Sequence, residues 1–274
     1  MAAINELNNT HSGFPLEPDR EPSAGLSSVL RALDLLELVA EAGGEIGVTE
    51  LAARSGMHKS SVSRVMATLA SRGYARQNPT TGRYALGLHL AKLGTASLAQ
   101  VDLRQQARPF VEQLCRASGE TVHLAEMIDD SIVYIDKAES EHVLTMRSRV
   151  GSSVPLHCTG LGKALCAFLP QDFVLRCLDR TGMVGYRPNT ITDRDEFLVC
   201  LAEIRERGYA IDDEEHEEGV RCVAVPVMDY LGRAVAAISV SGPTVRLSRG
   251  RLEEMVPLVT SVGRAISAAM GLRG

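Results

Sequence analysis

Three residues at fixed offsets constrain the fold of the N-terminal third more than any other feature. Ala52, Gly56 and Val62 follow one another at offsets of four and six residues. Where two helices cross at a tight turn, the crossing needs a small residue and the turn needs a glycine. The inner face of the second helix needs a branched apolar residue. This spacing predicts a helix-turn-helix, with helices over residues 49–55 and 59–71.

Helical periodicity and turn residues extend this prediction on both sides. Val29, Leu33 and Leu36 recur with a helical period, which predicts a helix over residues 27–43. Thr49 is a suitable N-cap for the first helix of the pair. After the second helix, the β-like runs "YARQ" and "RYAL" flank the turn "NPTTG". This pattern predicts the hairpin of a winged helix.

The two faces of the second helix differ in chemistry. One face carries an apolar stripe made of Val62, Val65, Met66 and Leu69. The opposite face carries small, hydroxylic or basic residues, namely Ser60, Ser63, Arg64, Ala67 and Ser71. Small side chains let a helix lie deep in the major groove of DNA, and arginine can bind guanine edges bidentately. An ordinary amphipathic helix with a solvated polar face is the alternative.

The distribution of charge favours DNA binding, although the net charge of the chain is −5. Residues 51–101 contain no Asp or Glu, and their basic residues are Arg54, Lys59, Arg64, Arg72, Arg76, Arg83 and Lys92. A basic block inside an acidic protein is typical of a phosphate-binding module. The expected DNA contacts are Lys59, Ser60, Ser61, Ser63 and Arg64 on the second helix, and Arg76 and Arg83 on the wing.

The rest of the chain divides by composition and pattern. Residues 1–25 are polar, with no secretory signal, and we expect a disordered arm. Because no apolar run is long enough to span a membrane, we expect a cytoplasmic protein. The winged helix-turn-helix takes residues 26–88, linker helices take 89–119 with a break near Asp102, and an effector-binding and oligomerisation domain takes 120–274.

The pattern of the C-terminal domain predicts an α+β fold built on an antiparallel sheet. Strands are expected on either side of Asp129–Asp130, over residues 142–157 with a bulge or loop at Gly151, and on either side of Leu231–Gly232. Helices are expected over residues 162–170 and 171–180, from residue 193 to a stop at Gly208, and over residues 251–270.

The six cysteines predict buried thiols rather than a metal or redox site. They are Cys115, Cys158, Cys166, Cys177, Cys200 and Cys222. None belongs to a C-x-x-C pair, which weakens zinc-ribbon and thioredoxin-like interpretations. In a reducing compartment such thiols pack as small hydrophobic groups. No cofactor is expected.

The segment "PLHCTGLGKAL", residues 155–165, allows three interpretations. A phosphate loop needs four residues between its glycines and a hydroxyl after the lysine, and this segment has neither. A cysteine hydrolase needs a base beside Cys158, but the neighbouring His157 points away from it in an extended chain. The third interpretation is a strand end followed by glycines and a helix start, whose amides can bind an anion without catalysis.

Four motifs together resemble the IclR family of bacterial transcriptional regulators. They are the helix-turn-helix core, "PLHCTGLGKAL", "RGYAIDDEEHEEGVRCVAVPV" and "AAISVSGP", in that order and spacing. The resemblance runs from about residue 26 to the C-terminus. It implies a winged helix-turn-helix, a linker helix and an effector-binding domain of GAF-like fold. It also implies a homodimer or dimer of dimers on a palindromic operator in double-stranded DNA.

The resemblance also implies an effector pocket for a small carboxylic or aromatic acid. Gly160 and Leu161 would supply backbone amides, while Asp212, Cys222, Ser239 and Ser241 would supply side chains. Met146, Val154 and Val220 are candidates for an apolar wall. Independently of the resemblance, Ser239 and Ser241 lie two residues apart on an expected strand and therefore face the same way. The family often has a small residue where this chain has Leu161, so the space beside the amides is reduced.

The acidic run "DDEEHEEG", residues 212–219, allows a metal site or a solvated acidic turn with one inward aspartate. We favour the turn. For the whole chain we expect a ligand-responsive repressor of a nearby catabolic operon and not an enzyme. Two rivals stay open. In one, the C-terminal domain is an enzyme with Cys158, Cys222 or Asp212 catalytic; in the other, it serves oligomerisation alone.

Overall fold

The structure is a computed structural model that describes residues 24–98, 102–142 and 148–272. These residues divide into two compact units, and the boundary falls between residues 101 and 102. Each unit is built around its own hydrophobic interior. Within the described ranges, no helix is long and apolar enough to cross a membrane.

Three helices contribute most of the small apolar core of the N-terminal unit. They are α2 (Ala24–Glu41), α3 (Val48–Ser55) and α4 (Lys59–Ser71). Gly56 ends α3 in the left-handed conformation with φ 69°, and Val62 is fully buried on the inner face of α4. The predicted turn and second helix are therefore confirmed. The N-cap prediction is wrong, because α3 begins after Gly47, where the Leu51 amide already donates to the Gly47 carbonyl.

The predicted wing is a two-stranded antiparallel hairpin. Its strands are β1 (Ala75–Gln77) and β2 (Tyr84–Leu86). The side chain of Asn78 accepts hydrogen bonds from the amides of Thr80 and Thr81, which shapes the turn between the strands. Tyr84 also pairs with Ile46 in an isolated bridge, so the wing is attached to the segment before α3.

The predicted break near Asp102 separates two helices that belong to different units. Helix α5 (Leu88–Leu98) lies in the N-terminal unit and α6 (Leu103–Ser118) in the C-terminal unit. The Asp102 side chain accepts a hydrogen bond from the Gln105 amide and so caps α6. The buried face of α6 joins the core of the C-terminal unit, and Pro109 is accommodated inside the helix.

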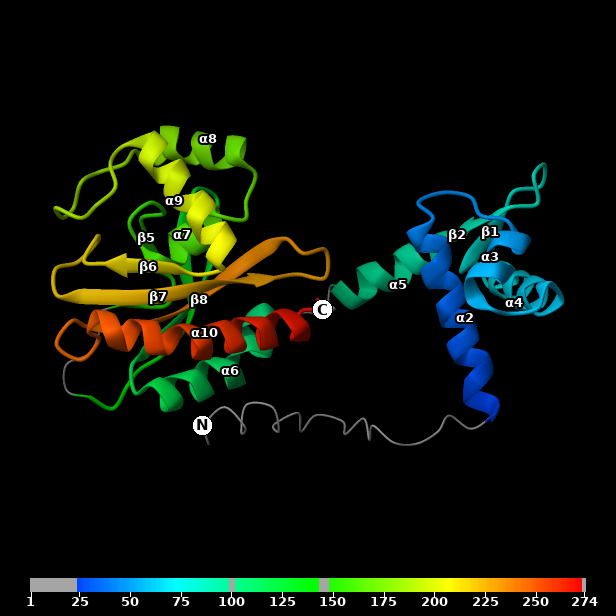
Figure 1. Cartoon of the computed structure of the whole chain (residues 1–274), viewed down its shortest axis with the longest axis horizontal. Helices are drawn as coiled ribbons and strands as arrows, with labels where there is room; N and C mark the ends of the chain where they lie inside the picture. Colours follow the sequence, from blue (N-terminus) through cyan, green and yellow to red (C-terminus); the bar gives the residue numbers. More distant parts are fainter. Residues whose placement is uncertain (1–23, 99–101, 143–147, 273–274) are drawn as a thin grey trace. The chain divides into compact units, whose positions relative to one another are not determined.

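The C-terminal unit is built on an antiparallel sheet (Figure 1). Its strand order is β5-β4-β3-β8-β7-β6. The strands are β3 (Thr121–Ile128), β4 (Ser131–Ala138), β5 (Ser153–Val154), β6 (Ala210–Asp213), β7 (Val220–Met228) and β8 (Ala234–Pro243). The β3–β4 hairpin turns at Asp129, which has φ 53°. This antiparallel sheet with flanking helices confirms the predicted α+β class.

Helices cover both faces of this sheet (Figure 1). On one face, α6 and α10 (Arg249–Ala269) pack against alternate apolar residues of β3, β7 and β8. On the other face lie α7 (Gly160–Cys166), α8 (Gln171–Thr181) and α9 (Arg194–Arg207). Strand residues alternate between the two faces of the sheet. The same three strands can therefore place apolar side chains in a core on one side and polar side chains on the other.

Two sequence predictions for this unit need correction. Over residues 142–157 only Ser153–Val154 is a strand, because Gly151 turns the chain at φ 88° and Pro155 follows directly; residues 143–147 lie outside the described ranges. Strand β6 was not predicted, because its sequence "AIDD" runs into the acidic segment and has little apolar alternation.

Of the predicted disordered arm, residues 1–23 also lie outside the described ranges, whereas Ala24 and Gly25 belong to α2.

Gly162 marks the closest approach between α7 and the preceding loop, which makes it a test of the packing. A Cβ atom at this position would lie 2.3 Å from the Leu156 carbonyl oxygen. We expect Gly162→Ala to destabilise the C-terminal unit by about 1–3 kcal/mol, measured as a lower Tm in thermal unfolding. Gly250→Ala in α10 is the control, because its Cβ would meet no atom within 4 Å. Equal Tm values for both variants would contradict the packing argument.

Candidate functional site

Helix α4 presents the residues that the sequence assigned to DNA contact. Val62 and Met66 are buried and anchor the helix to its unit. The side chains of Lys59, Ser60, Ser63 and Arg64 are exposed, and that of Ser61 is half-buried. The helix therefore offers an outward face of small and hydroxylic groups with one arginine, which is the shape that the major groove admits.

The two wing arginines differ in how far they are engaged by their own unit. Arg83 donates from Nε and Nη2 to the Glu45 carbonyl oxygen, at 3.1 and 2.9 Å. Arg76 lies 3.8 Å from the Glu45 carboxylate and its side chain remains 64% exposed. Arg76 is thus the wing arginine whose guanidinium is more available to a phosphate, while Arg83 also holds the wing to the rest of the unit.

A row of polar residues crosses the C-terminal sheet on the face towards α7. In the strand register, Asp212 lies opposite Cys222, Cys222 opposite Ser241, and Ser241 opposite Thr121. All of these side chains are at least nine-tenths buried. The sheet thereby brings together groups that are distant in sequence into one polar row beneath the start of α7.

A small cavity of about 40 Å³ lies over this row. Its wall comprises His123, Tyr134, Thr159, Gly160, Leu161, Asp212, His216, Glu217, Val220, Cys222 and Ser241. Lysine and arginine are absent from these described lining residues. The cavity is polar and narrow.

The structure brings six of the nine predicted effector residues together at this cavity. They are Gly160, Leu161, Asp212, Val220, Cys222 and Ser241. Ser239 is fully buried beside the cavity, and its hydroxyl lies 3.4 Å from that of Ser241. Val154 lines a neighbouring, larger cavity of about 370 Å³, and Met146 lies outside the described residues.

Five lining residues were missed by the sequence analysis. They are His123, Tyr134, Thr159, His216 and Glu217. Thr159 could have been found from the sequence, because a Thr before a glycine-rich helix start is a common N-cap. Its hydroxyl accepts a hydrogen bond from the Gly162 amide and so caps α7. His123 and Tyr134 come from β3 and β4, and only the strand pairing places them beside β8.

Gly160 allows α7 to begin directly against β7. A Cβ atom at this position would lie 2.7 Å from the Cys222 sulfur. A larger residue would therefore push the helix away from the sheet and change the cavity. This close approach is the physical reason for a glycine here, independent of any role of its amide.

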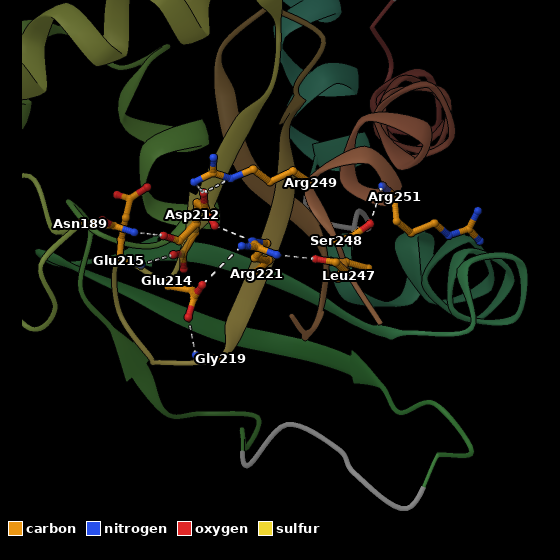
Figure 2. Close-up of polar contacts among 11 residues, drawn as sticks. Asn189, Asp212, Glu214, Glu215, Gly219, Arg221, Leu247, Ser248, Arg249 and Arg251 are labelled. Carbon is orange, nitrogen blue, oxygen red and sulfur yellow. Dashed lines mark hydrogen bonds and ion pairs between the residues drawn. The ribbon is translucent and has the colours of Figure 1, made fainter. Parts of the chain in front are cut away.

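The acidic run comprises the end of β6 and the loop to β7, and its carboxylates have specific partners (Figure 2). Asp213 and Glu214 contact Arg221, and Asp213 also pairs with Arg249. Glu214 accepts from the Gly219 amide at 2.9 Å. Within the described residues, no group of three or more His, Cys, Asp or Glu side chains could hold a metal ion. The loop is therefore ordered by arginines, and part of it turns inward.

Glu215 is the second inward carboxylate, and it forms a buried ion pair with Lys163 of α7. Both side chains are more than nine-tenths buried. The Glu215 amide donates to Asp212 Oδ1 at 2.9 Å, and its carbonyl accepts from Thr190. The ion pair thus joins the helix and the loop that form two sides of the cavity.

Burial sets the protonation of the acidic groups at this site. The pKa of Asp212 is raised to about 7, mainly by burial and also by the Glu215 charge. Burial raises the pKa of Cys222 and of Cys158 to about 12. It also raises the pKa of the four other cysteines, so these thiols carry their protons at neutral pH.

Two sequence profiles match successive parts of the chain. The profile described as "IclR helix-turn-helix domain" matches residues 28–79. The profile described as "Bacterial transcriptional regulator IclR C-terminal" matches residues 95–268. With the exposed α4 face, these matches define a DNA-binding transcriptional regulator of the helix-turn-helix class. The chain belongs to the IclR family of bacterial transcriptional regulators, which confirms the resemblance noted in its sequence.

Individual relatives match over nearly the whole chain. The HTH-type transcriptional regulator KdgR of Escherichia coli K12 is 41% identical over 253 residues, which covers 92% of this chain and 95% of the relative. The transcriptional repressor IclR of the same organism is 34% identical, covering 91% of this chain and 92% of the relative. The crystal structure of Thermotoga maritima IclR aligns with a TM-score of 0.60 at 32% identity, covering 90% of this chain and 99% of that one.

The raised pKa of Asp212 gives a pH-dependent stability. The native state holds this proton more tightly than the unfolded chain, so ionisation of Asp212 destabilises the fold as pH rises from about 4 to about 7. Asp212→Asn keeps the acceptor for the Glu215 amide and carries no charge. We expect this variant to gain stability relative to the wild type across that window, on the order of 1–4 kcal/mol, with a constant difference above it.

Urea unfolding at a series of pH values measures this difference. Asp213→Asn is the contrasting variant, because arginines lower the pKa of Asp213 and ionisation there stabilises the fold. An Asp212→Asn variant that loses stability relative to the wild type between pH 4 and 7 would contradict the assignment.

Proposed function

We propose that this IclR-family regulator represses a nearby catabolic operon and that a small organic acid bound in the C-terminal unit changes its affinity for the operator. The observation that carries the DNA half of this proposal is the outward face of α4, with Lys59, Ser60, Ser63 and Arg64 exposed on an anchored helix. Phosphate contacts by Lys59 and Arg76 would orient the unit, and Arg64 would read a base edge.

A palindromic operator requires two copies of this unit. Helix α2 carries an apolar face, with Val29, Leu30 and Leu33 exposed, that its own unit leaves uncovered. Exposed apolar patches of this kind mark interaction surfaces. A second copy of the chain would cover the patch and place two α4 helices on successive major grooves, as a homodimer or within a dimer of dimers.

The effector half of the proposal rests on the small cavity. Polar groups that are almost fully buried line it, and hydroxyls, a thiol and Asp212 converge there from four strands and α7. A molecule of a few heavy atoms fits, and the amides of Gly160 and Leu161 at the start of α7 favour a carboxylate. Operator DNA and effector must then change each other's affinity by the same factor.

Repression is the direction suggested by relatives. One is described as the transcriptional repressor IclR and another as the acetate operon repressor of Salmonella typhimurium, 33% identical over 266 residues. These descriptions belong to those proteins, and they support repression as the first hypothesis for this chain.

The physical chemistry of the cavity disfavours the enzyme alternative. A nucleophilic cysteine needs a lowered pKa and a neighbouring base. Burial raises the pKa of Cys158 and Cys222 to about 12, and His157 Nε2 donates to the Val184 carbonyl rather than contacting Cys158. Turnover of any small acid by the purified protein would overturn this interpretation. A domain serving oligomerisation alone would show no thermal stabilisation by any acid.

Fluorescence anisotropy with the DNA upstream of the protein's own gene tests the proposal. We expect tight binding that survives an excess of random-sequence competitor and weakens with salt. Binding equal to that of random DNA, both alone and with small carboxylic acids added, would contradict the operator assignment.

Arg64→Ala should lower the affinity for operator DNA by about 1–3 kcal/mol while leaving the affinity for random DNA nearly unchanged. Arg54→Ala is the matched control, because it removes the same charge from the same unit. Its guanidinium is engaged by Glu41 at 2.6 Å, and we expect a smaller effect. If Arg64→Ala lowers the affinity for operator and random DNA equally, Arg64 contacts a phosphate rather than a base edge.

Ser241→Ala should weaken the response to the effector and leave DNA binding without effector intact, since its hydroxyl lines the cavity. Ser239→Ala should have the smaller effect, because Ser239 acts through Ser241. Anisotropy with and without the acid measures both. A loss of effector-free DNA binding would show that these hydroxyls serve the fold instead.

A further inference from the structure

His123 is a buried polar residue at the edge of the small cavity. It lies on β3, directly opposite Ser239 of β8, and only 1% of it is exposed. Its side chain forms part of the cavity wall. The ring therefore lies at the boundary of the space that a bound molecule would occupy.

Two contacts hold the imidazole of His123 in one orientation. Its Nε2 lies 2.7 Å from the Ser148 hydroxyl, and the ring of Tyr134 packs on it with centroids 4.7 Å apart. The other ring nitrogen, Nδ1, is buried and has no hydrogen-bond partner among the described residues. The two contacts thus hold the ring, while Nδ1 has no partner among the described residues.

Buried polar atoms without partners are rare and call for a physical reason. In the described part of the chain, the side-chain atoms of this kind are His123 Nδ1, Asp136 Oδ2, Ser140 Oγ and Glu215 Oε2. Of these four residues, His123 alone lines the small cavity. Its missing partner can therefore be supplied by a molecule bound there.

The charge state of the ring limits what that partner can be. Burial and the nearby Lys137 lower the pKa of His123 to about 3, so the imidazole is neutral at neutral pH. Nδ1 then offers either an N–H or a lone pair, according to whether Nε2 accepts from or donates to Ser148. A hydroxyl can donate and accept, so it satisfies Nδ1 in either tautomer.

A carboxylate is a poorer partner for His123 at this position. Asp212 and Glu217 already contribute carboxyl groups to the wall, and the described lining residues include neither lysine nor arginine. An anion next to the neutral ring would face these acids, and the nearby cations Lys137 and Lys163 are already paired with Glu139 and Glu215. The surroundings of His123 therefore favour an uncharged, hydrogen-bonding group.

We propose that His123 is a specificity-determining residue of the effector cavity, and that its Nδ1 hydrogen-bonds a hydroxyl group of the effector. This inference rests on the proposed function and narrows it: the effector is a small acid that bears a hydroxyl. Ser148 and Tyr134 act as positioning residues, because they orient the ring and leave Nδ1 open.

Calorimetric titration of the full-length protein with lactate, glycerate and propionate tests the proposal. Propionate has the same carbon skeleton as the other two acids but no hydroxyl. We expect the wild type to bind lactate or glycerate at least about tenfold more tightly than propionate, a difference of one good hydrogen bond. We expect His123→Phe, which keeps the ring volume, to lose this preference and to bind all three acids alike.

His157→Phe is the matched control. His157 is also buried, but its Nε2 lies 3.0 Å from the Val184 carbonyl and it does not line the small cavity. The control should keep the preference for hydroxylated acids. A His123→Phe variant that keeps the preference, or a wild type that prefers propionate or binds none of the acids at millimolar concentration, would overturn the inference.

A second measurement needs no variant and so does not depend on whether His123→Phe folds. In wild-type protein labelled with nitrogen-15 at histidine, the His123 Nδ1 resonance should shift on addition of lactate or glycerate and stay unchanged with propionate. An unchanged resonance with the hydroxylated acids would overturn the proposal. Operator binding is measured on the same samples. If the protein binds its operator but shows no preference for hydroxylated acids, the inference about His123 fails while the assignment as a DNA-binding regulator stands.

Discussion

The ion pair between Lys163 and Glu215 is the interaction on which the geometry of the C-terminal site depends. It joins α7 to the loop between β6 and β7, and that loop and the adjoining β6 carry Asp212, His216 and Glu217 into the cavity wall. A buried charge without its partner is strongly unfavourable, so neither side chain can leave the other without water entering. The pair therefore sets the distance between the helix and the loop, and with it the width of the space that a ligand can occupy.

The sheet supports this arrangement because one face is apolar and the other carries polar residues. Alternate residues of β7 and β8, such as Val223 and Val240, pack against α6 and α10 in a dry core. Their neighbours Cys222 and Ser241 face α7 and the cavity. Polar groups can thus be collected on one face without interrupting the apolar packing on the other. A rigid core behind the cavity also keeps the polar row in register.

Local rules predicted much of the fold, whereas the site depended on pairing that sequence alone does not specify. Residues 59–71 were predicted as a helix with the observed bounds, because periodicity, a turn glycine and the apolar stripe agreed. The contribution of His123 could not be predicted, since it requires β3 to lie beside β8 in one particular register. The ion pair between Lys163 and Glu215, which lie 52 residues apart, could likewise not be predicted from the sequence. Ser239 was placed on the correct strand face, but its bond to Ser241 emerged only from the packing.

The buried cysteines limit the redox chemistry that is open to the C-terminal unit. Oxidants and electrophiles react with thiolates, and burial keeps all six thiols of this chain protonated at neutral pH. Cys222 sits in the wall of the cavity, where a sulfenic acid or an adduct would add bulk to a space of about 40 Å³. Its burial and its raised pKa both disfavour such modification. The geometry of this cavity is therefore less sensitive to peroxide and to changes in the thiol pool than that of a site built on a thiolate.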